Sequence, residues 1–383
     1  MTPGARVAAA IAVLDDIAGG TAAEQALTRW ARRSRFAGSK DRQAVRDHVF
    51  DVLRQRNTCA LNGGGSSGRA LMLGKLRIDG VDPQICFDGA GYAPAALVEP
   101  EKDILNSPLS DDADLDLPEW MRPLFQRALG VGWRTTAGQL RSRAPITIRA
   151  NTARTTRDEL AVALSSEGIT ALPNPVADTA LAVKDGARQL RNTKSFHAGH
   201  FEFQDAASQA LVLGLPDART ALDYCAGGGG KALAMAARGF AVSAHDANPK
   251  RMADLPERAR RAGAQITIET QADQIATYDL VLCDVPCSGS GAWRRSPEGK
   301  WALTPARLEE LTATQDSILD NARLLVRDQG TLVYATCSVL WEEDEDRIDA
   351  FLSRHQDWSC TQSVRWDVSD DCDGFFAAHL TRE

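Results

Sequence analysis

The sequence predicts an α/β protein that contains a mostly parallel sheet. From Ala221 onward, short apolar segments alternate with segments of helical spacing, a pattern typical of a sheet covered by helices on both faces. The conspicuous glycines and cysteines directly follow these apolar segments. Because ligands bind at the carboxyl ends of the strands in such sheets, the pattern also predicts where a site lies. The predicted strands are residues 221–224, 241–245, 266–269, 280–283 and 331–334.

Two smaller regions precede this sheet. The first is rich in Ala, Leu, Val and Arg at helical spacing, as at Val7 and Leu14, which predicts a small helical domain with a glycine-rich loop at residues 62–68. In the second, residues 146–151 are a strand candidate and Thr156 can cap the next helix, which predicts a small α+β subdomain. The predicted domains are residues 1–115, 116–200 and 201–383.

The end of the chain predicts an antiparallel edge for the sheet. Asp373-Gly374 separates two apolar segments, and an Asp-Gly pair in this position is typical of a hairpin. The predicted fold class is therefore α/β, with a mostly parallel sheet and an antiparallel edge hairpin. A small α+β subdomain and an all-helical amino-terminal domain precede this sheet.

The composition argues against several classes of protein. Among the 383 residues no apolar run approaches the roughly 18 residues that a membrane span needs, so we expect a soluble cytoplasmic protein with no membrane partner. Eight scattered cysteines without CxxC pairs argue against a disulfide scaffold and against a zinc site, so we expect no metal. We also expect a monomer.

The charge is unevenly distributed. The net charge of −7 argues mildly against a nonspecific nucleic-acid binder. However, nine Lys or Arg stand against three Asp between Arg29 and Arg56, while residues 342–346 concentrate acid near the other end. This distribution is compatible with a basic face on an acidic protein, and solvated helix surfaces explain it equally well.

A glycine-rich turn follows the first predicted strand of the sheet. Residues 223–231 read Asp-Tyr-Cys-Ala-Gly-Gly-Gly-Gly-Lys and lead into a predicted helix, so backbone amides can face a ligand without obstruction from a Cβ. Ala232 stands where a dinucleotide fingerprint needs its third glycine and where a phosphate-binding loop needs Ser or Thr. The sequence therefore argues against both of these binding sites.

Asp246 ends the next predicted strand, about twenty residues beyond the glycines, where an acidic side chain typically accepts hydrogen bonds from ribose hydroxyls. A helix N-cap before Pro249 is the alternative role of this residue. An adenosyl ligand held by ribose and backbone contacts fits the pattern best.

Two cysteines follow later strands in turns of small polar residues. The turns read Asp284-Val-Pro-Cys287-Ser-Gly-Ser-Gly and Ala335-Thr-Cys337-Ser. An intracellular cysteine is more often a small buried hydrophobe than a nucleophile. Here, however, both cysteines follow strands that are expected to neighbour the glycine turn, which indicates reactive thiols.

Two thiols at one site match the chemistry of cytosine methylation. Addition of a thiolate to carbon 6 makes carbon 5 nucleophilic enough to accept a methyl group, and a base must then remove the carbon 5 proton. One cysteine can attack and the other can assist release, but the residues alone do not order them. Asp284 can hold the nitrogen 3 and exocyclic amine edge. Lys231 can orient Asp284 or lower a thiol pKa, or it can merely cap its own helix.

These motifs resemble those of the Sun-type (Nol/Nop/Sun) family of RNA cytosine-5 methyltransferases. The resemblance covers most of the chain from about Pro118 and includes residues 203–209, 284–301 and 332–345, together with the terminal hairpin. It implies a Rossmann-like methyltransferase domain, S-adenosylmethionine as cofactor, Cys337 as the nucleophile and Cys287 as the residue that aids product release. The cofactor-binding residues that it implies are Cys225, Ala226, Gly227, Gly228, Gly229, Gly230, Lys231, Asp246, Asp273 and Asp284.

The first hundred or so residues resemble, less specifically, the NusB-like RNA-binding domain fused to some ribosomal RNA members. The resemblance rests on Ala5-Arg6, Asp41-Arg42 and residues 49–54. It favours small-subunit ribosomal RNA as the substrate, with a helical packing domain that makes no RNA contacts as the alternative. Arg294 and Arg295 are further candidates for phosphate contacts.

Other functions remain as alternatives. Transfer RNA is the alternative substrate for the same chemistry. A non-catalytic RNA-binding ribosome assembly factor would be expected to lack Cys337 or Asp284, and both are present. An adenine or protein methyltransferase usually has a proline-aromatic motif after the fourth strand, whereas Pro286 is followed here by Cys287.

Overall fold

The predicted sheet is present in the computed structural model, which describes residues 1–111, 116–270 and 277–382. The chain divides into two units. The predicted three-domain division stays a prediction. The first unit comprises Met1–Gln126, Gly130–Arg143 and Trp293–Ala302, and the second comprises Arg127–Leu129, Ala144–Ala292 and Leu303–Glu383.

The first unit is built from helices. Its core contains the side chains at the predicted positions, including Val7 and Leu14, each at most 3 % exposed. The helices of this region of the chain are α1 (Pro3–Ala18), α2 (Ala23–Arg33), α3 (Ser39–Arg54), α4 (Arg56–Gly63), α5 (Gly68–Ile78), α6 (Glu99–Leu105), α7 (Arg122–Leu129), α8 (Trp133–Gln139) and α14 (Glu298–Ala302).

Helices α4 and α5 approach each other closely at two glycines. A Cβ added to Gly63 would lie 1.8 Å from the carbonyl oxygen of Ala70, and one added to Gly74 would lie 1.9 Å from that of Cys59. The expectation of a loop over residues 62–68 is therefore wrong at its start. Gly63 is the last residue of α4, because its missing side chain is needed for helix packing rather than for a turn.

The second unit begins with a four-stranded antiparallel sheet of order β2-β3-β1-β4. Strand β1 (Ile146–Ala150) and the helix α9 (Arg157–Ser166) that follows it agree with the predicted strand and helix. Thr156 and Glu159 form a capping box at the start of α9, so two backbone donors of its first turn are satisfied. The remaining elements are β2 (Thr170–Pro173), β3 (Ala180–Asp185), α10 (Lys194–His197) and β4 (Phe201–Phe203).

The predicted larger sheet follows, and it has seven strands in the order β10-β11-β9-β8-β5-β6-β7. Strands β5 to β9 are parallel to one another, and β10 and β11 form the antiparallel edge hairpin predicted around Asp373-Gly374, with β11 pairing antiparallel to β9. The strands are β5 (Thr220–Asp223), β6 (Ala241–His245), β7 (Ile266–Glu269), β8 (Tyr278–Asp284), β9 (Val326–Thr336), β10 (Trp358–Trp366) and β11 (Phe375–Arg382).

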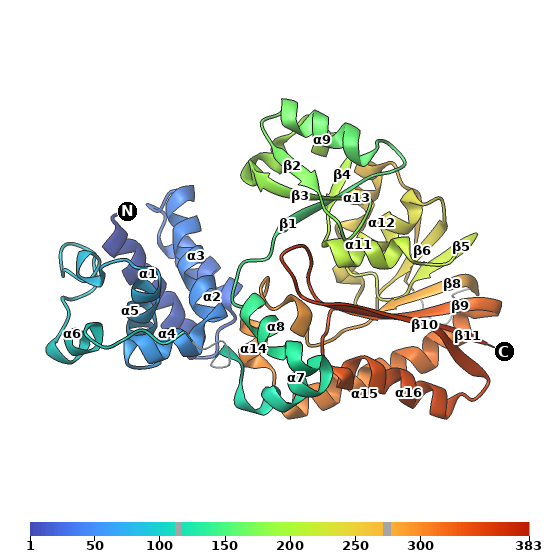
Figure 1. Cartoon of the computed structure of the whole chain (residues 1–383). Coiled ribbons are helices and arrows are strands. Elements are labelled where there is room, and N and C mark those ends of the chain that lie inside the picture. Colours follow the sequence, from blue (N-terminus) through green and yellow to red (C-terminus); the bar gives the residue numbers. More distant parts are fainter. Residues whose placement is uncertain (112–115, 271–276, 383) are drawn as a thin grey trace. The chain divides into compact units, whose positions relative to one another are not determined.

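Helices cover both faces of this sheet, as Figure 1 shows. Alternate residues of a strand point to opposite faces: Leu280 and Leu282 of β8 belong to one apolar cluster, whereas Val281 and Cys283 belong to the other. Burial on both faces explains why these strands appear as continuous apolar runs in the sequence. The covering helices are α11 (Ala206–Leu213), α12 (Gly230–Ala237) and α13 (Leu255–Ala262) on the first face and α15 (Pro305–Ala322) and α16 (Glu345–Arg354) on the second.

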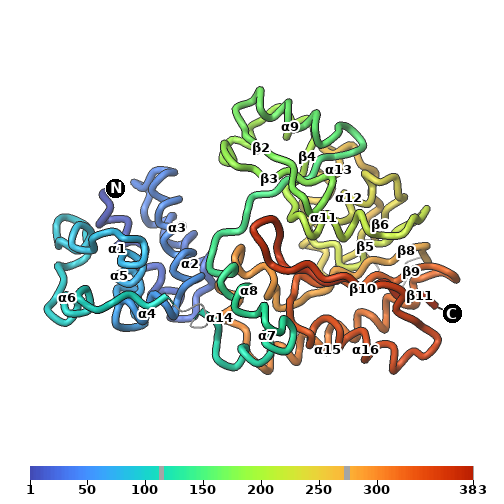
Figure 2. Tube along the Cα trace, in the orientation of Figure 1, coloured from blue at the N-terminus to red at the C-terminus, as the bar shows by residue number. Residues whose placement is uncertain are grey.

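The last strand enters the sheet rather than lying at its edge. In Figure 2 the red tube returns so that β11 lies between β9 and β10. The turn before β11 also contacts the turn after β8, since Gly374 N donates to the Gly291 carbonyl at 3.0 Å. The end of the chain is thereby attached to the carboxyl ends of the central strands.

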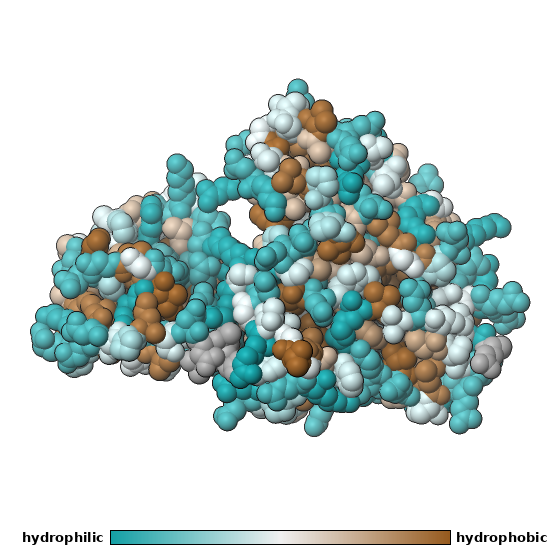
Figure 3. All heavy atoms as spheres, viewed as in Figure 1, coloured by the Kyte–Doolittle hydropathy of each residue, from teal (hydrophilic) through white to brown (hydrophobic). Residues whose placement is uncertain are grey.

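The described helices include none that is both long and apolar enough to cross a membrane. On the face drawn in Figure 3, hydrophobic residues form separate patches among hydrophilic ones.

Candidate active site

The turns after three neighbouring strands come together in the second unit. Strand β8 pairs with β5 on one side and with β9 on the other, so the glycine turn, the Asp284–Cys287 turn and the Cys337 turn lie next to one another. The motifs share one edge of the sheet because parallel strands have their carboxyl ends on the same side.

The two predicted cysteines are in contact. Their Sγ atoms lie 3.5 Å apart, a hydrogen-bond distance for sulfur, and both side chains are partly exposed. The hydrogen bond to Cys337, together with burial, raises the pKa of the Cys287 thiol well above its usual value. Either sulfur can be the donor of this hydrogen bond.

Lys231 joins the glycine turn to Asp284. Its Nζ lies 2.6 Å from Asp284 Oδ2. Burial alone would lower the pKa of Lys231, but the negative charges of Asp284, Asp223 and Cys337 raise it above its usual value. A charged lysine in the first turn of α12 opposes the helix dipole, so the ion pair explains its position better than a role as a helix cap does.

Asp223 is a charged group that the sequence reasoning did not single out. It ends β5, directly before the glycine turn, and is 1 % exposed. Burial raises its pKa to about 7, and the nearby carboxylates of Asp284 and Asp246 add to this effect. The sequence signal that could have identified Asp223 is an acidic residue at the end of an apolar strand. Of the three carboxyl groups at this edge of the sheet, Asp284 and Asp246 are ion-paired with Lys231 and Arg251.

The glycine turn is shaped by the side chains that pack over it. Gly227 and Gly229 have φ angles of +51° and +77°, which other residues rarely adopt. The directions in which Cβ atoms would point are occupied: Arg251 lies over Gly227, Arg258 over Gly228 and Leu255 over Gly229. Other side chains of the protein therefore occupy the Cβ directions at these three glycines, and the contact of their backbone amides with a ligand stays a prediction.

Gly230 differs from its neighbours. The nearest atom to a Cβ added there is Gln204 Nε2 at 3.9 Å. Gly230 is the first residue of α12, and a Cβ added there would have more room than one added to the three preceding glycines.

Substitution of Gly229 is expected to show how tightly this turn is packed. An alanine Cβ would lie 2.2 Å from Leu255 Cδ1 and would require a positive φ, so Gly229→Ala should lower the free energy of unfolding by about 2 kcal/mol. Gly228→Ala is the matched control, because it would meet only the flexible end of Arg258 at 3.1 Å. Urea unfolding of both variants would measure the difference, and equal losses would contradict this account of the turn.

Asp246 supports the glycine turn from β6. Its Oδ2 accepts from Gly227 N and its Oδ1 from Asn248 N, both at 2.9 Å, and Arg251 forms an ion pair with it at 3.1 Å. The alternative role as a helix N-cap is wrong: Asn248 is the capping residue, and it accepts from Lys250 N. The contact of Asp246 with a ribose stays a prediction.

The remaining predicted cofactor residues lie at the start of the turn or outside the described structure. Cys225 is half-buried and Ala226 donates its N–H to the carbonyl of His245 at 2.8 Å. Asp273 lies outside the described residues.

Arg294 does not face solvent. It is 1 % exposed within the helical unit, where its carbonyl accepts a hydrogen bond from Arg54 Nε at 2.8 Å. The expectation that Arg294 contacts phosphate is therefore wrong, because its guanidinium is buried. Arg295 is exposed, and its contact with phosphate stays a prediction.

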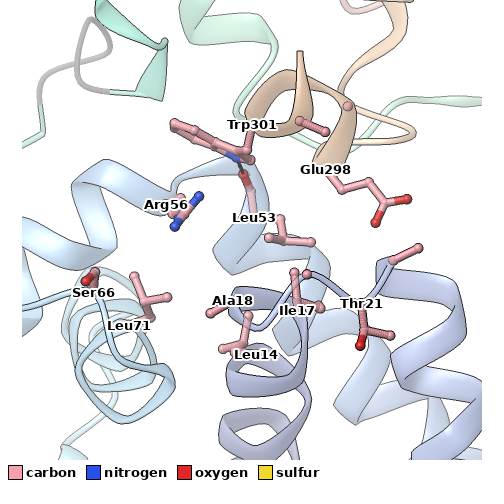
Figure 4. A pocket seen from close by; sticks show the side chains of 14 residues that line it. Leu14, Ile17, Ala18, Thr21, Leu53, Arg56, Ser66, Leu71, Glu298 and Trp301 are labelled. Carbon is pink, nitrogen blue, oxygen red and sulfur yellow. Dashed lines mark hydrogen bonds between the residues drawn. The ribbon is translucent and has the colours of Figure 1, made fainter. Parts of the chain in front are cut away.

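A cavity of about 510 Å³ lies in the helical unit (Figure 4). Apolar side chains of α1 and α3, such as Leu14 and Leu53, form part of its wall, and the Arg56 guanidinium lies 5.4 Å from the Trp301 ring. None of its described lining residues belongs to the predicted site. The candidate active site is therefore identified by chemistry at the strand ends rather than by the size of a cavity.

Comparisons with known proteins agree with the predicted fold. The model of the family described as 16S rRNA methyltransferase RsmB/F matches residues 210–381, and the ferredoxin-like domain of RsmF/B-like methyltransferases matches residues 117–188. The proteins named ribosomal RNA small subunit methyltransferase B from Salmonella arizonae and from Salmonella typhi are each 30 % identical over 302 residues, covering 74 % of this chain and 70 % of the relative.

Solved structures resemble the whole chain. The crystal structure of PH0851 has a TM-score of 0.74 at 19 % identity and covers 100 % of this chain and 99 % of its own. The structure of NSun6 from Pyrococcus horikoshii with SFG has a TM-score of 0.59 at 18 % identity and covers 69 % of this chain and 98 % of its own. At these identities the likeness concerns the fold.

The doubly wound sheet with its antiparallel edge hairpin, together with the match of residues 210–381 to a methyltransferase family model, defines this chain as a methyltransferase. The chain belongs to the RsmB/F family of 16S rRNA methyltransferases. The predicted resemblance to the Sun-type family and the predicted fold class are thereby confirmed.

Proposed function

We propose that this protein is an S-adenosylmethionine-dependent RNA cytosine-5 methyltransferase that acts on small-subunit ribosomal RNA. The observation that carries the proposal is the pair of sulfur atoms 3.5 Å apart beside the Lys231–Asp284 ion pair. The names of the Salmonella relatives support the choice of RNA. The NSun6 structure with SFG, an analogue of S-adenosylmethionine, supports the choice of methyl donor.

Cys337 is the proposed nucleophile. Because the pKa of Cys287 is raised, Cys287 acts as the hydrogen-bond donor of the pair and stabilises a thiolate on Cys337. The thiolate adds to carbon 6 of the cytosine, and carbon 5 then becomes nucleophilic. The proton shared by the two sulfurs thus supports the order of roles that the family resemblance implies.

Cys287 is proposed to act after the methyl group has been transferred. Its pKa is raised by the hydrogen bond to Cys337 and by the negative charge on that sulfur. Both effects are lost once the Cys337 sulfur is bonded to carbon 6. Cys287 then loses its proton to water more readily, and its thiolate can accept the carbon 5 proton while the bond between carbon 6 and the Cys337 sulfur breaks and Cys337 leaves as a thiolate.

Asp284 and Lys231 are proposed to orient the base. The Asp284 side chain is 32 % exposed, and Lys231 holds one of its carboxylate oxygens. In this position Asp284 holds the nitrogen 3 and exocyclic amine edge of the cytosine, where positive charge develops during methyl transfer. Lys231 fixes the direction in which Asp284 points.

The residues around the glycine turn fit S-adenosylmethionine, which when bound supplies the methyl group. Its sulfonium is cationic, and the partly exposed carboxylate of Asp284 is an acidic group beside the glycine turn. The residues proposed to hold it are Cys225, Ala226, Gly227, Gly228, Gly229, Gly230, Lys231, Asp246 and Asp284, with Asp273 added from the family resemblance.

Two measurements test the proposal. Isothermal titration calorimetry of the protein with S-adenosylmethionine should show one binding site, and bisulfite sequencing should show 5-methylcytosine at a single position of small-subunit ribosomal RNA. Methylation of transfer RNA transcripts alone would replace the proposed substrate by the alternative one. Absence of S-adenosylmethionine binding would leave the non-catalytic assembly factor as the better hypothesis.

A further inference from the structure

A buried carboxylate lies beneath the two cysteine turns. Glu343 ends the short helix η10 (Trp341–Glu343) and is 0 % exposed. It has no charged partner within salt-bridge distance among the described residues. A buried charge without a partner is costly unless many hydrogen bonds satisfy it, and the bonds that Glu343 makes are therefore informative.

The bonds of Glu343 reach both cysteine turns. From the Cys287 turn, Ser288 N donates to Glu343 Oε1 at 2.7 Å, and Ser288 Oγ donates to Oε2. From the Cys337 turn, Ser338 Oγ donates to Oε2 at 2.7 Å. One carboxylate thus binds the residue that directly follows each cysteine.

Helix α15 adds a third attachment. Gln315, which is 0 % exposed, donates through Nε2 to Glu343 Oε1 at 3.1 Å and to the Pro286 carbonyl at 3.0 Å. Pro286 directly precedes Cys287. The Cys287 turn is therefore held on both sides of the cysteine, by the Glu343 carboxylate and by the amide of Gln315.

The Glu343 carboxylate is the acceptor in each of these hydrogen bonds. Ser338 Oγ already accepts from Leu340 N at 3.0 Å and lies 2.9 Å from Ser290 Oγ, which itself accepts from Val339 N. The hydroxyl protons consequently run towards Glu343, which is the final acceptor of the network. A glutamine at this position would present an amide donor either to Ser288 N or to the hydroxyls, and neither arrangement satisfies all partners.

We propose that Glu343 is a positioning residue that holds the Cys287 and Cys337 turns together so that the two sulfur atoms remain in contact. It acts through Ser288 and Ser338 and does not touch the substrate. The inference rests on the proposed function for its catalytic meaning, but the contact between the sulfurs can be measured without RNA or methyl donor.

The test uses Glu343→Gln in the full-length protein, with Glu342→Gln as the matched control. Glu342 is the preceding residue, and its carboxylate binds Arg127 at 2.8 Å instead of the cysteine turns. Diamide removes two electrons and two protons from a thiol pair, and mass spectrometry gives the rate at which the Cys287–Cys337 disulfide forms. The rate should fall at least tenfold in Glu343→Gln and remain at the wild-type value in Glu342→Gln.

Methyl transfer provides the second measurement. In Glu343→Gln, kcat should fall about a hundredfold while the KM for S-adenosylmethionine stays unchanged, because the glycine turn is left intact. Wild-type rates of both disulfide formation and methyl transfer in this variant would overturn the inference. If the wild type transferred no methyl group but the disulfide rates differed as expected, the proposed function would fail and the positioning role would stand.

A second variant keeps the inference testable if Glu343→Gln does not fold. Ser338→Ala removes one donor to Glu343 and no charge. It should slow disulfide formation to a rate between those of the wild type and Glu343→Gln. An unchanged rate in a folded Ser338→Ala protein would count against the positioning role.

Discussion

Replacement of Cys337 by alanine is expected to abolish methyl transfer, with a loss of at least about a thousandfold. Without the thiolate, carbon 5 of cytosine is too weak a nucleophile to accept the methyl group. Replacement of Cys287 is expected to have a different result: Cys337 still adds to the base, but release is blocked, so a covalent complex of protein and RNA accumulates. The two substitutions therefore separate attack from release.

The measurement combines transfer of radiolabelled methyl groups with denaturing gels that detect the covalent complex. Cys360→Ala is the matched control, because Cys360 is an exposed cysteine on strand β10 and should leave both readouts unchanged. Full turnover by Cys337→Ala would refute the assignment of the nucleophile. A covalent complex in Cys337→Ala rather than in Cys287→Ala would reverse the two roles.

Replacement of Gly291 by alanine is expected to have a large effect on stability. Gly291 N donates to the Cys337 carbonyl, and its own carbonyl accepts from Gly374 N, each at 3.0 Å. A Cβ at this position would lie 2.3 Å from the Gly374 carbonyl oxygen and 2.7 Å from Gly374 Cα. Because backbone atoms cannot rotate away, the hairpin turn must shift, and we expect a loss of about 3 kcal/mol in the free energy of unfolding.

Gly289→Ala provides the control for this prediction. Gly289 lies in the same turn and has a φ of +69°, but no atom lies within 4 Å of a Cβ added there. The Gly289→Ala variant should therefore lose only about 1 kcal/mol in the free energy of unfolding, from backbone strain. Urea unfolding followed by circular dichroism would compare the two variants, and an equal loss in both would show that crowding against Gly374 is unimportant.

The strands of the larger sheet could be predicted from short apolar runs, and the central strands β5, β6 and β8 are buried on both faces. Residues 241–245 and 266–269 were predicted with the bounds that β6 and β7 have in the structure. Their apolar runs are short, and glycines or polar residues follow them, so local sequence is sufficient. The hairpin at Asp373-Gly374 could also be predicted from local sequence, because the Asp-Gly pair separates two apolar segments. The position of β11 between β9 and β10 could not be predicted in this way.

The role of the acidic run at residues 342–346 could not be predicted from its composition. The sequence indicated only a concentration of negative charge. In the structure Glu343 and Asp344 are 0 % exposed, whereas Glu342 and Asp346 bind Arg127 at the surface. Which of these neighbouring carboxylates is buried depends on the path of the chain after β9, and that path is set by packing against α15 and the edge hairpin.

By itself the sequence determined the fold class and the chemical groups at the ends of the strands. Short-range patterns specify strands and turns, and the parallel order brings the turns to one edge of the sheet. Only the tertiary structure decided that Lys231 pairs with Asp284, that the glycines accommodate Arg251, Arg258 and Leu255, and that Glu343 joins the cysteine turns. These contacts link residues from different strands and helices, and their geometry depends on packing that no local pattern encodes.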